Sequence, residues 1–178
     1  AMEGVALDLG CGPGDITRRF ANAFPACRIH AIDGAESMLM FARQMIDFER
    51  LHERIRLFKR LLPTDSLPKA QYDAVICNSL LHHLDDPMVL WRSVNDFAKP
   101  GAAVLIMDLM RPESPEQAEV MRQQYAANEP RVLQQDFYHS LLAAYTPEEV
   151  EAQLREVGLG HLKVEVISDR HLIISGRR

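Results

Sequence analysis

Three glycines stand close together near the start of the chain, where they could bring the peptide backbone against a ligand. The apolar segment Val5–Leu9 precedes them, and Gly10, Gly12 and Gly14 follow. Glycine has no Cβ, so it adopts a positive φ at little cost and lets a ligand lie against the main chain. A helix that begins just after such a loop directs its free N–H groups into it. The pattern therefore predicts a strand-to-helix turn that contacts a ligand through its backbone.

A carboxylate follows at a spacing that suits a ribose-binding acid. Asp33 comes nineteen residues after Gly14, at the end of the short segment Arg28–Ile32. An acid at the end of a second strand can accept hydrogen bonds from a ribose diol. The glycine spacing is G-x-G-x-G, whereas the dinucleotide fingerprint of dehydrogenases is G-x-G-x-x-G. One alternative is therefore a nicotinamide-dependent dehydrogenase, although the glycine spacing of this chain does not match the dehydrogenase fingerprint. The other alternative is a tight turn that binds no ligand.

A third feature lies further along the chain, where Tyr72–Leu84 has the sequence YDAVICNSLLHHL. With the glycine loop and Asp33, it makes residues 5 to about 110 resemble the class I S-adenosylmethionine-dependent methyltransferases, in particular small-molecule enzymes in which a Leu-His-His-Leu turn follows the fourth strand. The resemblance implies an α/β, Rossmann-like fold with a seven-stranded, mostly parallel sheet, helices on both faces and an antiparallel C-terminal hairpin. It also implies methyl transfer from S-adenosylmethionine to a small-molecule acceptor, with S-adenosylhomocysteine as the product.

The same resemblance assigns roles to residues around the glycine loop. The backbone of Gly10, Cys11 and Gly12 would line the methionine portion of the cofactor, with Asp8 directed toward that portion or its ammonium group. Asp8 could instead cap the N–H groups of the loop. Asp33 would hold the ribose hydroxyls, and an N-cap of the following helix is the alternative. The full set of cofactor-binding candidates is Asp8, Gly10, Cys11, Gly12, Gly14, Asp33, Gly34, Met38, Leu61, Asn78 and Ser79.

The adenine end of the expected site departs from the family's pattern. Relatives often place an acid just after the third strand, where this chain has Lys59–Leu62 and a first acid only at Asp65. We therefore expect Leu61 and Leu62 to contact the adenine in place of an acid. Met38 could pack against the adenine or the ribose, or could belong to the core.

Polar side chains near the ends of the fourth and fifth strands are candidates for the acceptor side of the site. Asn78 and Ser79 would border the transferring methyl group, because open α/β sheets bind ligands beyond the carboxyl ends of their strands. Of two adjacent histidines, His82 is the preferred general base, and a structural role for either is the alternative. Asp108 could meet the substrate or form an ion pair with Arg111. No second acid stands next to Asp108, so we expect no metal site.

The composition sets the class of protein. The chain has 178 residues, a formal net charge of −5 and three cysteines. This length predicts a single domain over residues 1–178, and the acidic balance argues against nucleic acid as the main partner. Three cysteines make no disulfide framework, and no apolar run is long enough for a membrane span. We expect a cytoplasmic protein that acts on a small molecule away from membranes, as a monomer or a homodimer.

Hydrophobic periodicity predicts that strands and helices alternate up to about residue 108 and follow a different order thereafter. The predicted strands lie at about 5–9, 28–32, 54–58, 73–78, 102–108, 162–167 and 171–175, and the predicted helices at about 15–24, 35–49, 85–98, 115–128, 131–144 and 147–157. Thr146, Pro147 and Glu149 predict a capping box at the last helix. A helical insertion at about 112–145 is expected to cover the acceptor pocket.

Relatives usually carry one or two helices ahead of the first strand that close over the cofactor. The segment before Val5 is too short for them, so we expect this cover to be absent. Its absence would admit water to the site, or would require a homodimer to supply a lid. A noncatalytic or partner subunit that binds the same nucleoside is therefore the alternative to an enzyme.

Overall fold

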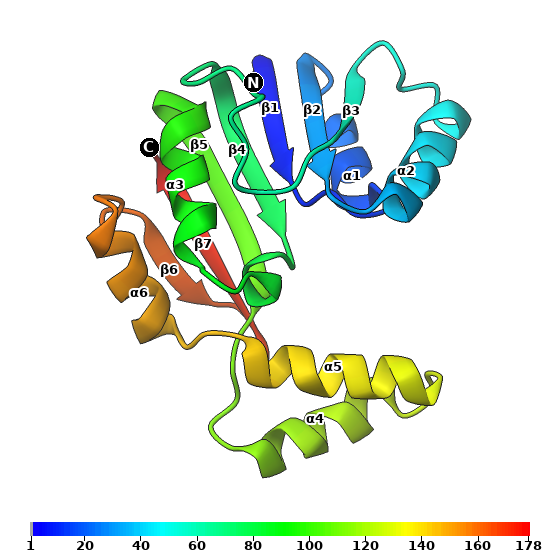
Figure 1. Cartoon of the computed structure of the whole chain (residues 1–178), viewed down its shortest axis with the longest axis vertical. Helices are drawn as coiled ribbons and strands as arrows, with labels where there is room; N and C mark the ends of the chain where they lie inside the picture. The colour runs from blue at the N-terminus through cyan, green and yellow to red at the C-terminus, as the bar shows by residue number, and fades with distance from the viewer. Residues whose placement is uncertain (1) are drawn as a thin grey trace.

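A computed structural model of the protein describes residues 2–178, so Ala1, which the predicted domain includes, lies outside the described residues. Seven strands of this part form one sheet in the order β3-β2-β1-β4-β5-β7-β6 (Figure 1). Their bounds are β1 Gly4–Leu9, β2 Cys27–Asp33, β3 Ile55–Lys59, β4 Tyr72–Asn78, β5 Ala98–Leu109, β6 Lys163–Val166 and β7 His171–Arg177. The first five strands run parallel, and β7 is antiparallel to both β5 and β6. The predicted Rossmann-like sheet with its C-terminal hairpin is confirmed.

Strand register brings the predicted ligand-binding segments to one edge of the sheet. Leu9, the last residue of β1, pairs with Ile32 of β2 on one side and with Cys77 of β4 on the other. The residues that come next along these strands are the glycine loop, Asp33 and Asn78. All three segments therefore meet at the carboxyl ends of neighbouring parallel strands, where such sheets bind ligands.

Helices cover both faces of the sheet (Figure 1). Their bounds are α1 Asp15–Ala23, α2 Glu36–Phe48, α3 Met88–Phe97, α4 Pro115–Ala126, α5 Arg131–Ala143 and α6 Pro147–Glu156, with a 3₁₀ turn, η1, at Leu81–His83. Alternate strand residues face opposite layers, so Ala6 is buried with α1 and α2 and Leu7 with α3 and α6. The buried Trp91 of α3 donates its indole N–H to Gln153 of α6 at 2.8 Å. None of the helices within residues 2–178 is both long and apolar enough to cross a membrane.

The start of β5 differs from the prediction. The sequence predicts a strand from residue 102, after Lys99–Gly101 has ended α3, but β5 already begins at Ala98. Tyr72 of β4 pairs with Ala98, and the register between the two strands then shifts. Gly101 accommodates the irregularity with a φ of 78°. The boundary depends on a pairing partner elsewhere in the chain, which local turn residues do not reveal.

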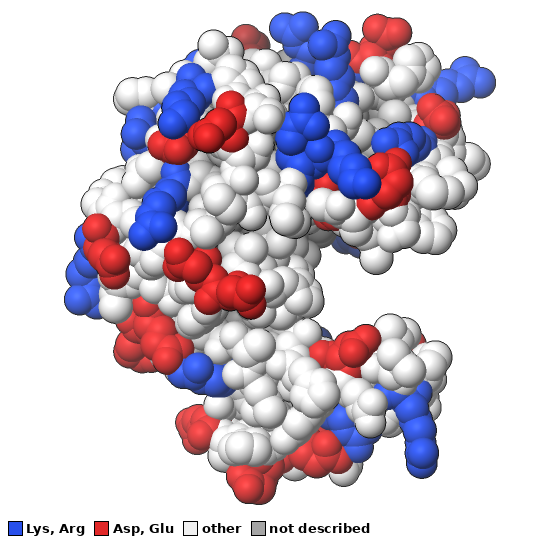
Figure 2. Space-filling view, viewed as in Figure 1, with Lys and Arg blue, Asp and Glu red and all other residues white. Residues whose placement is uncertain are grey.

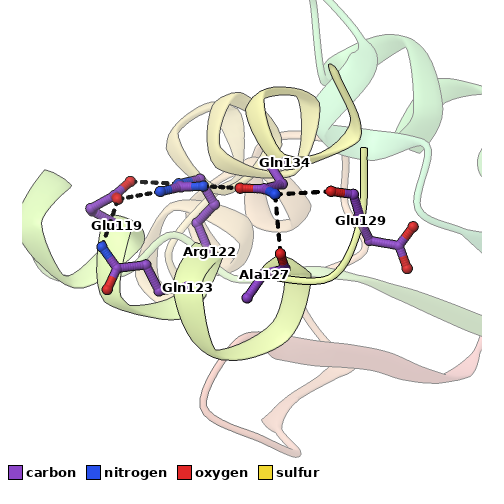
Figure 3. A network of polar contacts seen from close by, with 6 residues as sticks. All are labelled: Glu119, Arg122, Gln123, Ala127, Glu129 and Gln134. Carbon is purple, nitrogen blue, oxygen red and sulfur yellow. Dashed lines mark hydrogen bonds and ion pairs between the residues drawn. The ribbon is translucent and has the colours of Figure 1, made fainter. Parts of the chain in front are cut away.

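After β5 the chain forms two packed helices, α4 and α5, which we call the arm. Figure 1 shows the arm projecting beyond the carboxyl ends of the parallel strands. Figure 3 shows polar contacts that join its helices: Arg122 of α4 donates to Gln134 of α5, and Gln134 donates to the Glu129 carbonyl at 2.9 Å. A small core lies between them and is separate from the cores of the sheet; its buried members are Leu109, Ala118, Met121, Leu141 and Ala144. The arm has the position of the predicted helical insertion.

The last helix, α6, begins with the predicted capping box. Thr146 Oγ1 accepts a hydrogen bond from the Glu149 N–H at 3.3 Å, and the Glu149 carboxylate accepts one from the Thr146 N–H at 2.9 Å. Pro147 occupies the first turn, where a missing N–H costs no helical hydrogen bond. The two contacts satisfy N–H groups that a helix cannot satisfy by itself.

Replacing Thr146 should therefore destabilise the protein through α6. We expect Thr146→Ala to lower the free energy of unfolding by about 1 kcal/mol, because the N-cap acceptor is lost. Thr146→Ser retains the hydroxyl and is the matched control. Urea denaturation followed by circular dichroism measures both variants, and an alanine variant as stable as the serine variant would show that the cap contributes nothing.

Candidate functional site

The glycine loop is fixed to the end of β2 by backbone hydrogen bonds. The N–H groups of Gly10 and Cys11 both donate to the carbonyl of Ile32 at 2.9 Å. Gly10 has a φ of 71°, and a Cβ built on it would lie 2.9 Å from a methyl carbon of Leu80. Only glycine fits between this turn and the segment after β4. The loop therefore stands against β2 on one side and the β4 turn on the other.

Gly14, unlike Gly10 and Gly12, allows two helices to pack closely. It has a φ of 90° and immediately precedes α1. A Cβ here would lie 2.6 Å from Cε of Met45 and 3.3 Å from Cβ of Ala42, both on α2. Gly14 thus lets α1 begin close against α2, and it does not line the cavity described below.

Asp33 joins the glycine loop to the start of α2. One carboxylate oxygen accepts from the Gly12 N–H at 2.8 Å, and the other accepts from the Ala35 N–H at 2.8 Å. The N-cap position of α2 belongs to Ala35, so the contact from Asp33 is a turn that precedes the helix. A carboxylate has about four acceptor sites, so two remain for a ligand such as a diol.

Asp8 lies inside the sheet with its carboxylate at the floor of the loop. Its side chain is 1% exposed, and one oxygen accepts from the Thr17 hydroxyl of α1 at 2.5 Å. Burial raises the pKa of Asp8 to about 7; the Thr17 hydrogen bond opposes this shift, and the charge of Asp33 adds to it. Within residues 2–178, the donor to this carboxylate is a side-chain hydroxyl and not a loop N–H.

Cys11 is a neutral thiol in this loop. Burial, followed by the nearby carboxylates of Asp8 and Asp33, raises the pKa of its thiol well above the usual range. A thiolate is the nucleophilic form of cysteine, so Cys11 is poorly suited to covalent chemistry. Its contribution to a ligand site is its backbone and its apolar surface.

Two adjoining cavities open at the carboxyl edge of the sheet, and we call them together the cleft. Their volumes are about 580 and 390 Å³, and they share Gly10, Asp33, Ala35, Leu80 and His83. Both volumes lie in the range of small-ligand pockets. All the predicted cofactor-binding residues except Gly14 line the cleft: Asp8, Gly10, Cys11, Gly12, Asp33, Met38, Asn78 and Ser79 in the first cavity, and Gly34 and Leu61 in the second.

The second cavity is mostly apolar and is lined by one arginine, Arg60. Leu61 and Leu62 line it with Arg60, whereas Asp65 does not. Leu61 is 77% exposed and so has apolar surface available for a flat ligand group. Leu61 and Leu62 thus line the cleft, and their contact with an adenine stays a prediction.

The turn after β4 forms the opposite wall of the first cavity. Ser79 has a φ of 55°, which is uncommon for a residue other than glycine, and its N–H donates to the Met107 carbonyl at 2.9 Å. Asn78 donates its amide to the Ser79 hydroxyl at 3.0 Å. Backbone strain of this kind persists where the surrounding structure imposes it, which marks the turn as a constrained position.

A buried histidine–aspartate pair holds η1 against the end of β5. The Nδ1 atom of His82 lies 2.5 Å from the Asp108 carboxylate, which also accepts from the N–H groups of Leu81 at 2.8 Å and Leu109 at 2.7 Å. Asp108 is 1% exposed, and neither member of the pair lines the cleft. The predicted alternative of an Asp108–Arg111 ion pair is not formed, because Arg111 pairs with Glu149 of α6.

His83, and not His82, faces the cleft. It lines both cavities, and its ring centroid lies 4.0 Å from that of His82. Burial lowers the pKa of His83, and the adjacent His82 lowers it further. The sequence alone does not distinguish the two histidines, because Asp108, which pairs with His82 and holds it away from the cleft, is distant in the chain.

The sequence analysis also missed Thr17, the hydrogen-bond partner of Asp8. Its position three residues after Gly14 is the one indication that the sequence offers.

The charge in the first cavity is of one sign. Asp8, Asp15 and Asp33 line it, and no lysine or arginine does so. Such a lining favours a cationic ligand over an anionic one. The residues that the structure describes contain no group of three or more His, Cys, Asp or Glu side chains arranged to hold a metal ion.

Comparison with known proteins gives the family. A family model described as a methyltransferase domain matches residues 7–104, which is more than half of the chain. This chain belongs to the methyltransferase-domain family. The matched segment of the methyltransferase domain contains the glycine loop, Asp33 and the turn after β4, so it includes most of the cleft.

Individual relatives agree with this placement. The chain is 30% identical over 156 residues to a ubiquinone biosynthesis O-methyltransferase of Bordetella bronchiseptica, with 86% of this chain and 61% of that protein covered. It is 28% identical over 106 residues to a malonyl-[acyl-carrier protein] O-methyltransferase of Hahella chejuensis, with 58% and 36% covered. The chain spans about three fifths of the length of this Bordetella bronchiseptica protein.

Solved structures show the same fold. A SAM-dependent methyltransferase from Aquifex aeolicus superposes with a TM-score of 0.72 at 18% identity, and the match covers 98% of this chain and 81% of that one. Because the match covers 98% of this chain, it includes the antiparallel C-terminal strands as well as the parallel strands.

The Asp108 pair should contribute to stability. We expect Asp108→Ala to lower the free energy of unfolding by about 3 kcal/mol, because it leaves the Leu81 N–H and the His82 ring buried without their acceptor. Asp108→Asn keeps one acceptor oxygen and should lose less. Urea denaturation compares the two variants, and an alanine variant of wild-type stability would contradict this role.

Proposed function

We propose that this methyltransferase domain transfers a methyl group from S-adenosylmethionine to an oxygen atom of a small-molecule acceptor. The observation that carries the proposal is the convergence of three segments, the glycine loop, Asp33 and the β4 turn, on one cleft at the carboxyl edge of the sheet. Membership in the methyltransferase-domain family supports the reaction type. The curated relatives named O-methyltransferases support oxygen as the methylated atom.

The cofactor would lie along the cleft with its two ends in different surroundings. The methionine portion would rest on the backbone from Gly10 to Gly12, and the ribose hydroxyls would donate to Asp33. The adenine would enter the second cavity, where Leu61 and Leu62 offer apolar surface. The acidic lining of the first cavity would suit the sulfonium and ammonium charges of this cofactor.

For methyl transfer, the protein must hold the cofactor's methyl group and the acceptor oxygen in line and exclude water. Held by the glycine loop and Asp33, S-adenosylmethionine would supply an electrophilic methyl group, which the acceptor oxygen would take with displacement of a neutral thioether. A hydroxyl acceptor must also lose its proton. His83 is placed to take it, because its lowered pKa keeps the imidazole neutral near pH 7. His82 and Asp108 would act as positioning residues that hold η1.

The acceptor would approach from the side of the arm. Figure 2 shows a wide hollow between the arm and the body of the molecule, and Figure 1 shows the parallel strands pointing toward it. An acceptor in this hollow would lie between the β4 turn and α5. The insertion at about 112–145 would then determine which acceptors fit.

The two competing functions differ in what they require of the cleft. A nicotinamide-dependent dehydrogenase must bind a pyrophosphate, and the first cavity, which Asp33 lines and no lysine or arginine does, offers that anion no cationic side chain. A noncatalytic subunit would bind the same nucleoside without turnover. Formation of a homodimer, location in the cytoplasm and the absence of a nucleic-acid partner remain predictions from the sequence.

Nucleoside binding is the first test. Titration calorimetry should detect binding of S-adenosylmethionine and S-adenosylhomocysteine but not of NAD. We expect Asp33→Asn to weaken binding about 10- to 100-fold, because charged hydrogen bonds to the ribose are lost. Asp65→Asn, outside the cleft lining, is the matched control. The absence of binding of either nucleoside at millimolar concentration would refute the proposal.

Turnover with labelled S-adenosylmethionine and a panel of phenols tests the reaction and the role of His83. We expect His83→Ala to lower kcat about 100-fold with little change in cofactor affinity, because the proton acceptor is removed. With S-adenosylmethionine at saturation, the wild-type kcat/KM for the phenol should rise with pH through a transition below pH 6.5, since the pKa of His83 is lowered. The exposed His52→Ala is the control. A His83→Ala variant with wild-type kcat would exclude the base, and bound cofactor without any product would favour the noncatalytic subunit.

A further inference from the structure

The connection between β3 and β4, residues 60–71 of the described chain, crosses the sheet without a helix, and we call it the strap. Because the strand order is β3-β2-β1-β4, the strap passes over β2 and β1, as Figure 1 shows. The other connections between successive parallel strands contain α1, α2 and α3. A parallel crossover usually packs a helix on the sheet. Here an irregular segment must cover the same face.

One side chain holds the middle of the strap to the sheet. Leu67 is 6% exposed and belongs to the core cluster that contains Leu7 and Leu9 of β1. All the other residues of the strap are exposed or half-buried. Without the Leu67 side chain, the middle of the strap would therefore have no buried group.

Hydrogen bonds hold the strap at its two ends. At the start, the Arg60 N–H donates to the Asp33 carbonyl at 3.0 Å, and at the end the Ala70 N–H donates to the Asp96 carbonyl at 2.8 Å. Between these points, within the described chain, no backbone N–H of residues 61–69 donates to a group outside the strap. The burial of Leu67 is thus the main interaction that fixes the path of the strap between its ends.

The first residues of the strap form a wall of the second cavity. Leu61 and Leu62 line this cavity, and a Cβ built on Gly34 would lie 2.7 Å from Cδ1 of Leu61. Leu62 also packs against the core cluster that contains Leu67. Leu67 itself lines neither cavity of the cleft. Any effect of Leu67 on a ligand must therefore pass through the strap.

We propose that Leu67 is a positioning residue for the nucleobase, because it docks the strap and only the docked strap holds Leu61 and Leu62 against the second cavity. The inference rests on the proposed function, which places the adenine in that cavity. When the Leu67 side chain leaves the core, the strap is held at its two ends only and the wall is lost. A ligand that contacts this wall binds the docked form in preference, so by linkage it also raises the docked fraction.

Three ligands test which end of the cleft depends on Leu67. S-adenosylhomocysteine and 5′-methylthioadenosine contain the adenine, whereas S-ribosylhomocysteine has the ribose and the amino acid but no base. We expect Leu67→Ala to weaken binding of the first two about 10- to 30-fold, because truncation of a buried leucine lowers the docked fraction. The affinity for S-ribosylhomocysteine should change less than about twofold, since this ligand does not touch the wall. Titration calorimetry, with competition for the weaker ligands, measures all three.

Two further variants separate this role from a general loss of stability. Leu67→Met keeps a long apolar side chain and should retain the wild-type affinity for all three ligands. Leu159→Ala truncates a leucine that is 2% exposed and belongs to the same core cluster but lies outside the strap. This variant should lower the free energy of unfolding without changing the ratio of the affinities for S-adenosylhomocysteine and S-ribosylhomocysteine.

Limited digestion of the wild type with trypsin tests the reciprocal effect and needs no variant. Lys69 lies in the strap with 60% of its side chain exposed, and cleavage after it requires the strap to leave the sheet. S-adenosylhomocysteine and 5′-methylthioadenosine at saturation should slow this cleavage severalfold, and S-ribosylhomocysteine should not. Cleavage after Arg155 of α6, followed in the same digest by mass spectrometry, is the control.

The outcomes separate this inference from the proposed function. Wild-type affinity of Leu67→Ala for S-adenosylhomocysteine, or an equal loss of affinity for S-ribosylhomocysteine, would overturn the role of Leu67. If Leu67→Ala does not fold, cleavage after Lys69 at the same rate with and without S-adenosylhomocysteine in the wild type would overturn it. Failure of the wild type to bind S-adenosylhomocysteine at all would instead overturn the proposed function.

Discussion

The alignment of three strand ends is the constraint on which the site depends. Leu9 pairs with both Ile32 and Cys77, so β1, β2 and β4 end side by side. Because β1 lies between the other two, the glycine loop is bounded by both of the remaining segments. The Ile32 carbonyl receives two loop N–H groups, and Leu80 fills the space that a Cβ on Gly10 would need. A change of register in any of these strands would remove the cleft and not merely reshape it.

Local features of the sequence were sufficient to predict most of the fold and much of the cleft. The capping box at Thr146 was predicted because its hydrogen bonds lie within three residues. The glycine loop was predicted from its three closely spaced glycines, although the hydrogen bonds that hold it come from Ile32 and Asp33. The start of β5 at Ala98 was missed because it is set by pairing with β4. The orientation of the two histidines was missed for the same reason, since Asp108 is 26 residues from His82. Strand boundaries and side-chain orientations of this kind depend on contacts between segments that are distant in the sequence, which local patterns do not predict.

Burial gives the cleft its electrostatic character. Asp8 lies within β1 and Asp33 is the last residue of the neighbouring parallel strand β2. Their hydrogen bonds differ, because Asp33 accepts from two N–H groups, whereas Asp8 accepts from one hydroxyl. Burial raises the pKa of Asp8 to about 7. Two acids that look equivalent in the sequence therefore have different hydrogen-bond partners in the structure.

The acceptor side is built separately from the cofactor side. The arm has its own small core, and Tyr125 of α4 reaches the β6–β7 turn, where its hydroxyl donates to Asp169 at 2.6 Å and Arg170 stacks on its ring at 3.4 Å. These contacts fix the arm to the C-terminal hairpin and not to the glycine loop. Substitutions on α4 can therefore alter the hollow without touching β1, β2 or β4, whereas α5 also contacts η1. Substitutions on α4 could thus change which acceptor molecule the protein binds while the residues of the cofactor cleft stay the same.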